Sequence, residues 1–190
     1  RENVVYIEYY DNDFNIKSKK SIPMELELWG GFYHGSDGYY LVEGQNNEEE
    51  DDAKEVIRVI RYDRNWQKTG TAHITSVAGD EFGSVRYPFD YGCVEMAEIN
   101  GILYIATAHE GYVDPSVGQG HQGLLVIAVD QRTMTGEIID YDLWHSFAQY
   151  VKVRDNQLYL LELSEGSRCT TLSRYDTAAK QWKRISVYQY

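Results

Sequence analysis

The chain has 190 residues, with 30 acidic and 18 basic side chains and a formal net charge of −12. This charge opposes binding to nucleic-acid phosphates or to anionic bilayers, and no apolar stretch approaches the roughly 20 residues of a transmembrane helix. The 17 tyrosines, beside only 3 prolines, are typical of half-buried β-sheet surfaces.

An Asp-led turn is the clearest repeated pattern in the sequence. Each copy follows an apolar run and precedes a second one, so each indicates a β-hairpin. The repeat occurs at intervals of roughly 45 to 70 residues, which is the signature of a β-propeller built from four-stranded antiparallel blades. We therefore predict an all-β fold. The turns begin at Asp11, Asp63, Asp130 and Asp176.

In chain order, the pattern predicts a partial blade over residues 1–23 and full blades over 24–79, 88–142 and 146–190. The first blade contains only the third and fourth strands of the repeat, so about three and a half blades are present, whereas closed rings have about four or more. We expect a fragment of a larger propeller, or a ring that a second chain or a missing segment completes.

Each full blade carries a hairpin signal between its expected first and second strands. Because these signals fall at matching positions, they support the register of the repeat. The continuous apolar run 124–129 is typical of a strand that is buried on both faces, as stacked blades require. The hairpin signals are Ser36-Asp37-Gly38, Asn100-Gly101 and Asp155-Asn156.

Two insertions separate the expected second and third strands of a blade. The first, 43–52, ends in five consecutive acidic residues that would repel one another in a packed setting, so we expect a solvated loop. Its carboxylates could hold calcium. However, the ligand spacing and turn glycine of a dedicated calcium loop are missing, which favours a loop that only improves solubility.

The second insertion, 109–121, mixes polar, aromatic and flexible residues, and we expect a loop suited to ligand contact. Its candidate ligand-binding residues are His109, Tyr112 and His121. The two histidines could also share a metal ion with other histidines. Their spacing within a loop does not establish a ligand set, so no metal site is predicted.

The entry to the last blade provides further candidates. First strands line the central channel of a propeller, so Gln149 and the matching Glu95 one blade earlier are expected near it, with Tyr91 close by. Hydrogen bonding to the backbone of a neighbouring blade is the alternative for these polar groups. Trp144 beside His145 is a candidate platform for a sugar or peptide, although a Trp that caps the core explains the pattern equally well.

The common catalytic motifs are missing from the sequence. We find no Gly-rich phosphate loop, no His-Glu-x-x-His pair and no Gly-x-Ser-x-Gly elbow. Glu95, Glu110 and Asp114 could support glycosidic chemistry, but an acidic chain does not single them out. Cys93 and Cys169 fall in strands of different blades, which indicates two buried thiols rather than a disulfide.

Part of the chain, roughly 83–176, resembles repeats in propeller-like domains of large surface proteins from Gram-positive anaerobic bacteria. The matching segments are His121-Gln122, Val129-Asp130, Thr133-Met134 and 144–150. The resemblance implies an extracellular multidomain parent and a role in adhesion or glycan binding, without catalytic residues to carry over. Trp144 departs from the pattern, which has a small or polar residue there. The Asp-rich turn motif of sialidases is also missing, which weakens the enzymatic alternative.

We therefore predict a non-catalytic recognition module that binds carbohydrate or protein through loops on one propeller face. We expect no nucleic-acid partner, no membrane insertion, and no cofactor apart from the calcium considered above. A glycan hydrolase or lyase with carboxylates at the channel mouth is the first alternative. The second is a structural or assembly domain that pairs through an open blade edge.

Overall fold

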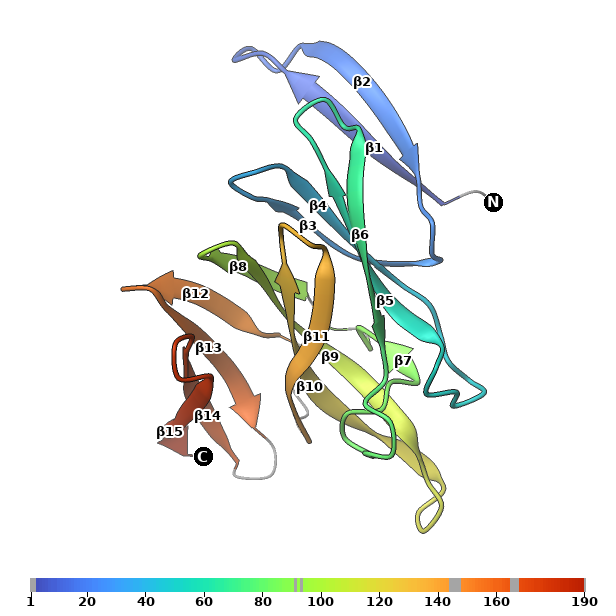
Figure 1. The fold of residues 1–190 in the computed structure, drawn as a ribbon, viewed down its shortest axis with the longest axis vertical. Helices are drawn as coiled ribbons and strands as arrows, with labels where there is room; N and C mark the ends of the chain where they lie inside the picture. Colours follow the sequence, from blue (N-terminus) through green and yellow to red (C-terminus); the bar gives the residue numbers. More distant parts are fainter. Residues whose placement is uncertain (1–2, 91, 93, 144–147, 165–167, 190) are drawn as a thin grey trace.

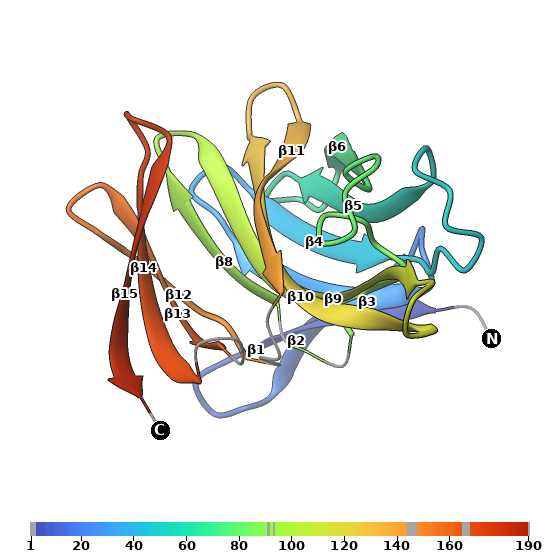
Figure 2. The ribbon, with the colours of Figure 1, turned by 90° about the horizontal axis from the view of Figure 1, so that it is seen from below.

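The computed structural model describes residues 3–90, 92, 94–143, 148–164 and 168–189. Its regular elements in these ranges are β-strands (Figures 1 and 2). Within the same ranges, no helix is long and apolar enough to cross a membrane.

The strands form four antiparallel sheets, each from one continuous part of the chain, which we name A to D. Sheet A contains β1 (Val4–Tyr10) and β2 (Ile16–Pro23), and sheet B contains β3 (Leu28–His34), β4 (Tyr39–Gly44), β5 (Glu55–Tyr62) and β6 (Lys68–Thr75). Sheet C contains β7 (Tyr87–Pro88), β8 (Val94–Ile99), β9 (Ile102–Asp114), β10 (Gln119–Asp130) and β11 (Thr135–Leu143). Sheet D contains β12 (Tyr150–Arg154), β13 (Gln157–Ser164), β14 (Cys169–Asp176) and β15 (Gln181–Gln189). The prediction of an all-β fold with four-stranded antiparallel sheets is confirmed.

The four Asp-led turns share one feature: the Asp side chain accepts hydrogen bonds from backbone N–H groups of its own turn. In the turn between β5 and β6, Asp63 Oδ1 accepts the backbone N–H groups of Asn65 and Gln67, both at 2.8 Å. The same type of Asx turn starts at Asp11, Asp130 and Asp176. Each turn ends on a residue with positive φ, namely Phe14, Trp66, Met134 or Lys180. Since these turns join the last two strands of sheets B, C and D, sheet A corresponds to the third and fourth strands of a full sheet.

The predicted hairpins between first and second strands are also present. They pair His34 with Tyr39, Ile99 with Ile102, and Arg154 with Gln157. In the two shorter turns, Asn100-Gly101 and Asp155-Asn156, both central residues have positive φ. This is the type I′ geometry, whose twist matches that of the flanking strands.

Consecutive sheets pack face to face, as Figure 2 shows. We call the face toward the following sheet the front and the other face the back. Sheet A packs on the back of sheet B, the front of sheet B packs on the back of sheet C, and the front of sheet C packs on the back of sheet D. The B–C contact buries Val42, Ile57, Leu103, Ile105 and Ile127, among others.

The expectation of a loop over 109–121 is wrong. β9 and β10 extend as a paired ribbon that includes Gln119 opposite Asp114. Asp114 starts a further Asp-led turn, which closes on Gly118 with a φ of 73°. The ribbon forms because antiparallel pairing satisfies the backbone groups of this polar segment.

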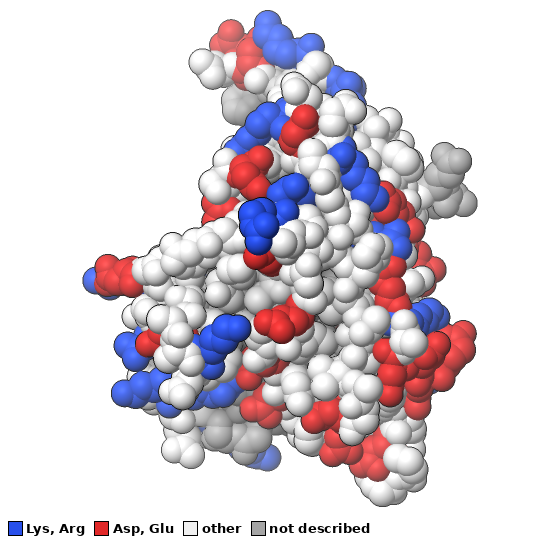
Figure 3. Space-filling view, viewed as in Figure 1, with Lys and Arg blue, Asp and Glu red and all other residues white. Residues whose placement is uncertain are grey.

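The acidic insertion is solvated only in part, so this expectation also needs correction. Glu43 is buried in β4, where its Oε2 accepts the N–H groups of Glu25 and Leu26 at 2.7 and 3.0 Å. Asn47 is buried too, and its amide donates to the Val85 carbonyl. These bonds satisfy polar groups that would otherwise need water. The exposed acids are Glu48, Glu49 and Asp51, and acidic side chains gather on this side of the molecule (Figure 3).

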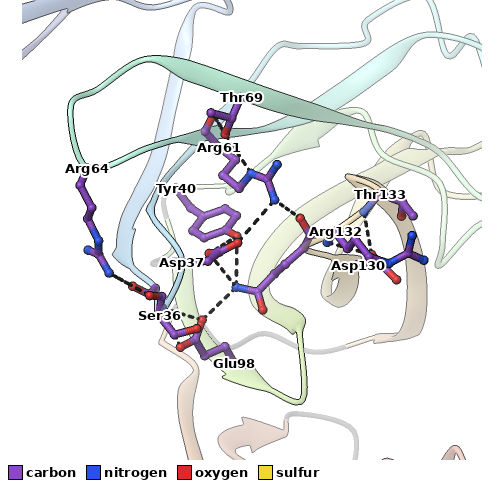
Figure 4. Close-up of polar contacts among 12 residues, drawn as sticks. Ser36, Asp37, Tyr40, Arg61, Arg64, Thr69, Glu98, Asp130, Arg132 and Thr133 are labelled. Carbon is purple, nitrogen blue, oxygen red and sulfur yellow. Dashed lines mark hydrogen bonds and ion pairs between the residues drawn. The ribbon is translucent and has the colours of Figure 1, made fainter.

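A polar cluster joins the turn ends of sheets B and C (Figure 4). The buried Gln131 amide donates to the Tyr40 hydroxyl at 3.1 Å and to the Glu98 carboxylate at 2.9 Å. Tyr40 donates in turn to Asp37 at 2.7 Å, and Arg61 donates to the Gln131 carbonyl. Burial and the Asp37 bond raise the pKa of Tyr40. Because the buried Tyr40 and Gln131 are hydrogen-bonded to each other across the two sheets, the cluster acts as a structural clamp.

The two cysteines were predicted to be buried thiols. Cys169 is buried at the start of β14, where its Sγ accepts a hydrogen bond from Ser186 Oγ at 3.3 Å and lies 3.4 Å from Thr171 Oγ1. Cys93 lies outside the described residues.

The buried Glu162 at the C–D contact predicts that the free energy of unfolding depends on pH. Its side chain is 2% exposed, and neither carboxyl oxygen has a hydrogen-bond partner among the described residues. Burial raises its pKa to about 8, from an ordinary 4.5. The folded state therefore keeps a proton that the unfolded chain releases, so the free energy of unfolding should fall between pH 4.5 and 8. The expected slope is about 1.4 kcal/mol per pH unit.

Urea unfolding over this pH range tests the prediction with Glu162→Gln. That variant should flatten the decline, whereas Glu137→Gln, at an exposed position on β11, should leave it unchanged. An unaltered pH profile in Glu162→Gln would contradict the assignment.

Candidate functional site

An open hollow of about 510 Å³ lies at the ends of sheets B and C that are opposite the clamp. It is formed by the start of β3, the segment after β4, β7 with the residues that follow it, and the middle of β9. The side chains that matter below are Trp29, Asn46, Tyr87, Phe89, Asp90 and Glu110.

Phe89 lies at the base of the hollow, directly on the backbone of two strands. An added Cβ on Gly44 would lie 2.7 Å from Phe89 Cε2, and one on Gly30 would lie 2.7 Å from Phe89 Cζ. Glycine at both positions is therefore what lets the ring approach β3 and β4 so closely.

The segment after β7 is locally strained. Phe89 and Asp90 both have positive φ, at 70° and 30°, which costs free energy for residues other than glycine. The Gly92 N–H closes this turn on the Phe89 carbonyl at 2.6 Å. The strained backbone places the Asp90 carboxyl in the wall of the hollow, where its Oδ2 is buried and has no hydrogen-bond partner among the described residues.

Glu110, on β9, supplies a second carboxylate. Burial raises its pKa, the Asp90 charge raises it further, and Arg86 partly opposes both. Arg86 lies 3.9 Å from Glu110 Oε1 and 3.8 Å from Glu50 Oε1, and its guanidinium stacks over the Tyr87 ring. The hollow thus holds two interacting carboxylates beside one shared cation, so a donor group on a ligand would relieve their repulsion.

Trp29 adds an aromatic surface to this polar wall. Its side chain is 46% exposed, although it lies in a strand. Asn46, after β4, contributes an amide with both donors and acceptors. An indole face beside carboxylates and an amide can bind a molecule that has an apolar face and several hydroxyl groups.

The sequence predicted eight ligand-binding residues. Tyr91, Trp144 and His145 lie outside the described residues. The other five do not line the hollow. Gln149 is buried just before β12, and Glu95 is half-buried on β8.

The remaining predicted residues lie along the β9–β10 ribbon. His109 is buried, with its Nε2 2.9 Å from the Phe82 carbonyl, and burial lowers its pKa to about 4. The Tyr112 hydroxyl lies 3.0 Å from Asp52 and accepts a bond from Asn47. His121 Nε2 is 3.7 Å from a carboxylate oxygen of Asp114. These contacts give His109 and Tyr112 packing roles, and ligand binding by the five residues stays a prediction.

Within the described part of the chain, no group of three or more His, Cys, Asp or Glu side chains could hold a metal ion. In the acidic insertion, Glu50 accepts the Val113 N–H at 2.9 Å and Glu49 forms an ion pair with Lys54. Calcium binding by this segment stays a prediction.

Sequence reasoning missed Trp29, Phe89 and Asp90, and it considered Glu110 without singling it out. A signal was available in Trp29 followed by Gly30, because glycine inside a strand marks the close approach of another group. No pattern in the sequence connects Trp29 and Gly30 to Asp90, because the packing of separate sheets brings these residues together.

Comparison with known proteins finds no matching family model and no matching curated protein. Among solved structures, a variant of the GH43 protein BlXynB from Bacillus licheniformis is 16% identical, with a TM-score of 0.46 over 86% of this chain and 32% of that chain. A variant of an exo-β-1,3-galactanase from Phanerochaete chrysosporium, with bound β-1,3-galactotriose, is 10% identical, with a TM-score of 0.49 over 97% and 43%. This chain thus spans less than half the length of either. Similarity at this level identifies no functional residues.

The Phe89 contact generates a testable prediction. Gly44→Ala should destabilise the protein by about 1–3 kcal/mol, because the new methyl group overlaps the Phe89 ring. Urea unfolding measures the loss. Gly31→Ala is the matched control, since its Cβ would meet the flexible end of Met96 at 3.1 Å. Adding Phe89→Ala should remove most of the further cost of Gly44→Ala, and additive losses in the double variant would disprove the contact.

Proposed function

We propose that the chain recognises a neutral glycan through the hollow at the ends of sheets B and C. The observation that carries the proposal is the half-exposed indole of Trp29 in the same hollow as the carboxyl groups of Asp90 and Glu110. The apolar face of a sugar ring would pack on the indole, while its hydroxyl groups would donate to the carboxylates.

The buried Asp90 Oδ2 supports a ligand that donates hydrogen bonds. Among the described residues this oxygen has no hydrogen-bond partner, and a buried acceptor without a partner is unfavourable. A sugar hydroxyl would supply the missing donor, and the strained backbone at Phe89 and Asp90 fits a position that is shaped for binding rather than for stability.

The negative charge of the hollow and of the whole chain favours a neutral ligand over an acidic one. The hollow contains two carboxylates, and the chain carries a net charge of −12. Uronate, sulfate or phosphate groups would be repelled by this field, because Arg86 already faces Glu50 and Glu110.

We also propose that sheets A to D are consecutive blades of a β-propeller. Their order along the chain, their face-to-face packing and the contacts of β8 with both β3 and β12 support this arrangement. First strands that adjoin one another are what a common axis requires. An extracellular location, which the resemblance to surface proteins implies, belongs to the same proposal.

A glycan-processing enzyme is the second candidate, and one observation favours it. The raised pKa of Glu110, with the Asp90 carboxyl group in the same hollow, is the pattern of a proton donor with a second carboxyl group nearby. Release of new reducing ends from an oligosaccharide by the wild-type chain would support this candidate over simple recognition.

Calorimetric titration tests the recognition proposal. Neutral gluco-, xylo-, galacto- and manno-oligosaccharides should include a ligand, whereas an oligogalacturonate should not bind. For the ligand found, Trp29→Ala should weaken affinity at least tenfold, or about 1.4 kcal/mol, through loss of the stacking surface. Phe32→Ala is the matched control, because Phe32 lies on the same strand, is 48% exposed and does not line the hollow. Unchanged affinity in Trp29→Ala, or an equal loss in Phe32→Ala, would refute the site.

A further inference from the structure

The stacking of the sheets leaves two faces uncovered. In each described contact, the front of one sheet meets the back of the next, from A to B, B to C and C to D. The front of sheet D and the back of sheet A therefore remain, and both carry exposed apolar side chains. One of these faces is a front and the other is a back, which is the combination found in each described contact between sheets.

The front of sheet D repeats a surface that is buried elsewhere in the molecule. Counted from the matching type I′ turns, Tyr159 and Leu161 on β13 correspond to Tyr104 and Ala106 on β9. Ala106 is 2% exposed beneath sheet D, whereas Leu161 is 37% exposed. The face also carries the exposed Ile185 and an open hollow of about 490 Å³.

The back of sheet A carries aromatic residues. Val5 and Ile7 point from β1 toward sheet B, so the alternating positions Tyr6 and Tyr10 lie on the opposite face. Tyr6 is 77% exposed, and Phe14 is more exposed still at the following turn. A sheet face with several exposed aromatic rings is typical of an interaction surface.

The sheet D face also carries cations that can pack on the aromatic rings of the sheet A face. On sheet D, Lys152, Tyr159, Arg174 and Lys183 form a continuous cross-strand row. Cations in such a row can pack on the tyrosine and phenylalanine rings of sheet A through cation–π contacts, while the apolar residues of both faces are buried.

We propose that the front of sheet D packs on the back of sheet A from a second copy of this chain. The contact continues the stack in the same direction, so it is head to tail rather than two-fold symmetric. Two copies that close a ring in this way would supply about eight blade positions, which lies within the range of known propellers. The inference does not depend on glycan binding.

Light scattering after size-exclusion chromatography tests this contact, with sedimentation velocity at several concentrations as a second measurement. The wild-type chain should shift with concentration from its monomer mass of 22.0 kDa toward that of two copies. Leu161→Asp with Ile185→Asp disables only the sheet D face, and Tyr6→Asp with Tyr10→Asp disables only the sheet A face. Each double variant alone should stay monomeric while keeping its far-UV circular dichroism.

An equal mixture of the two double variants tests directly whether the contact is head to tail. Each keeps one intact face, so a head-to-tail contact should re-form and restore the two-copy species. Val117→Asp, at an exposed apolar position on the β9–β10 turn, should associate like the wild type.

Three results would overturn the proposal. A wild-type chain that stays monomeric at every concentration would show that another occupant, such as a different protein or a further sheet, covers these faces. If the sheet D variant loses association while the sheet A variant still associates, the contact is a symmetric pairing of two sheet D faces. Failure of the mixture to re-associate would exclude the head-to-tail contact.

Discussion

The packing of the front of sheet B on the back of sheet C is the contact on which the rest of the molecule depends. Its branched side chains, among them Val42, Ile57, Leu103 and Ile105, are fully buried, and each contributes about 1.5–3 kcal/mol relative to exposure. Hydrogen bonds from Gln131 fix the turn ends of the two sheets. Sheets A and D pack on the outer faces that this central pair provides.

The candidate site is a consequence of the same contact at its other end. Phe89 rests on glycine backbone in sheet B, and the strained turn that carries it also carries Asp90. Because Glu110 follows the buried part of β9, the B–C packing fixes its distance from the start of β3, where Trp29 lies. Trp29 and Glu110 are therefore held by strands of the packed sheets, so the proposed ligand would meet these two side chains already in place, at little cost in ordering.

The sequence predicted structural features that depend on residues close together in the chain. It missed features that depend on the packing of separate sheets. The turns at Asp11, Asp63, Asp130 and Asp176 are local, because each carboxylate bonds to backbone groups within a few residues. The ribbon over 109–121 was missed because its glycines and polar residues hide the strand pattern. Trp29, Asp90 and Glu110 come together only once two sheets have packed, so no spacing along the chain could reveal that they share one hollow.

Native-state hydrogen exchange would test the central claim most directly. If the B–C contact organises the fold, the amides of Val42 and Leu103 should exchange through one shared opening, with the same free energy and the same dependence on urea. The Ile7 amide, in the two-stranded sheet A, should exchange at a lower free energy. Separate openings for Val42 and Leu103, with different free energies, would contradict the account.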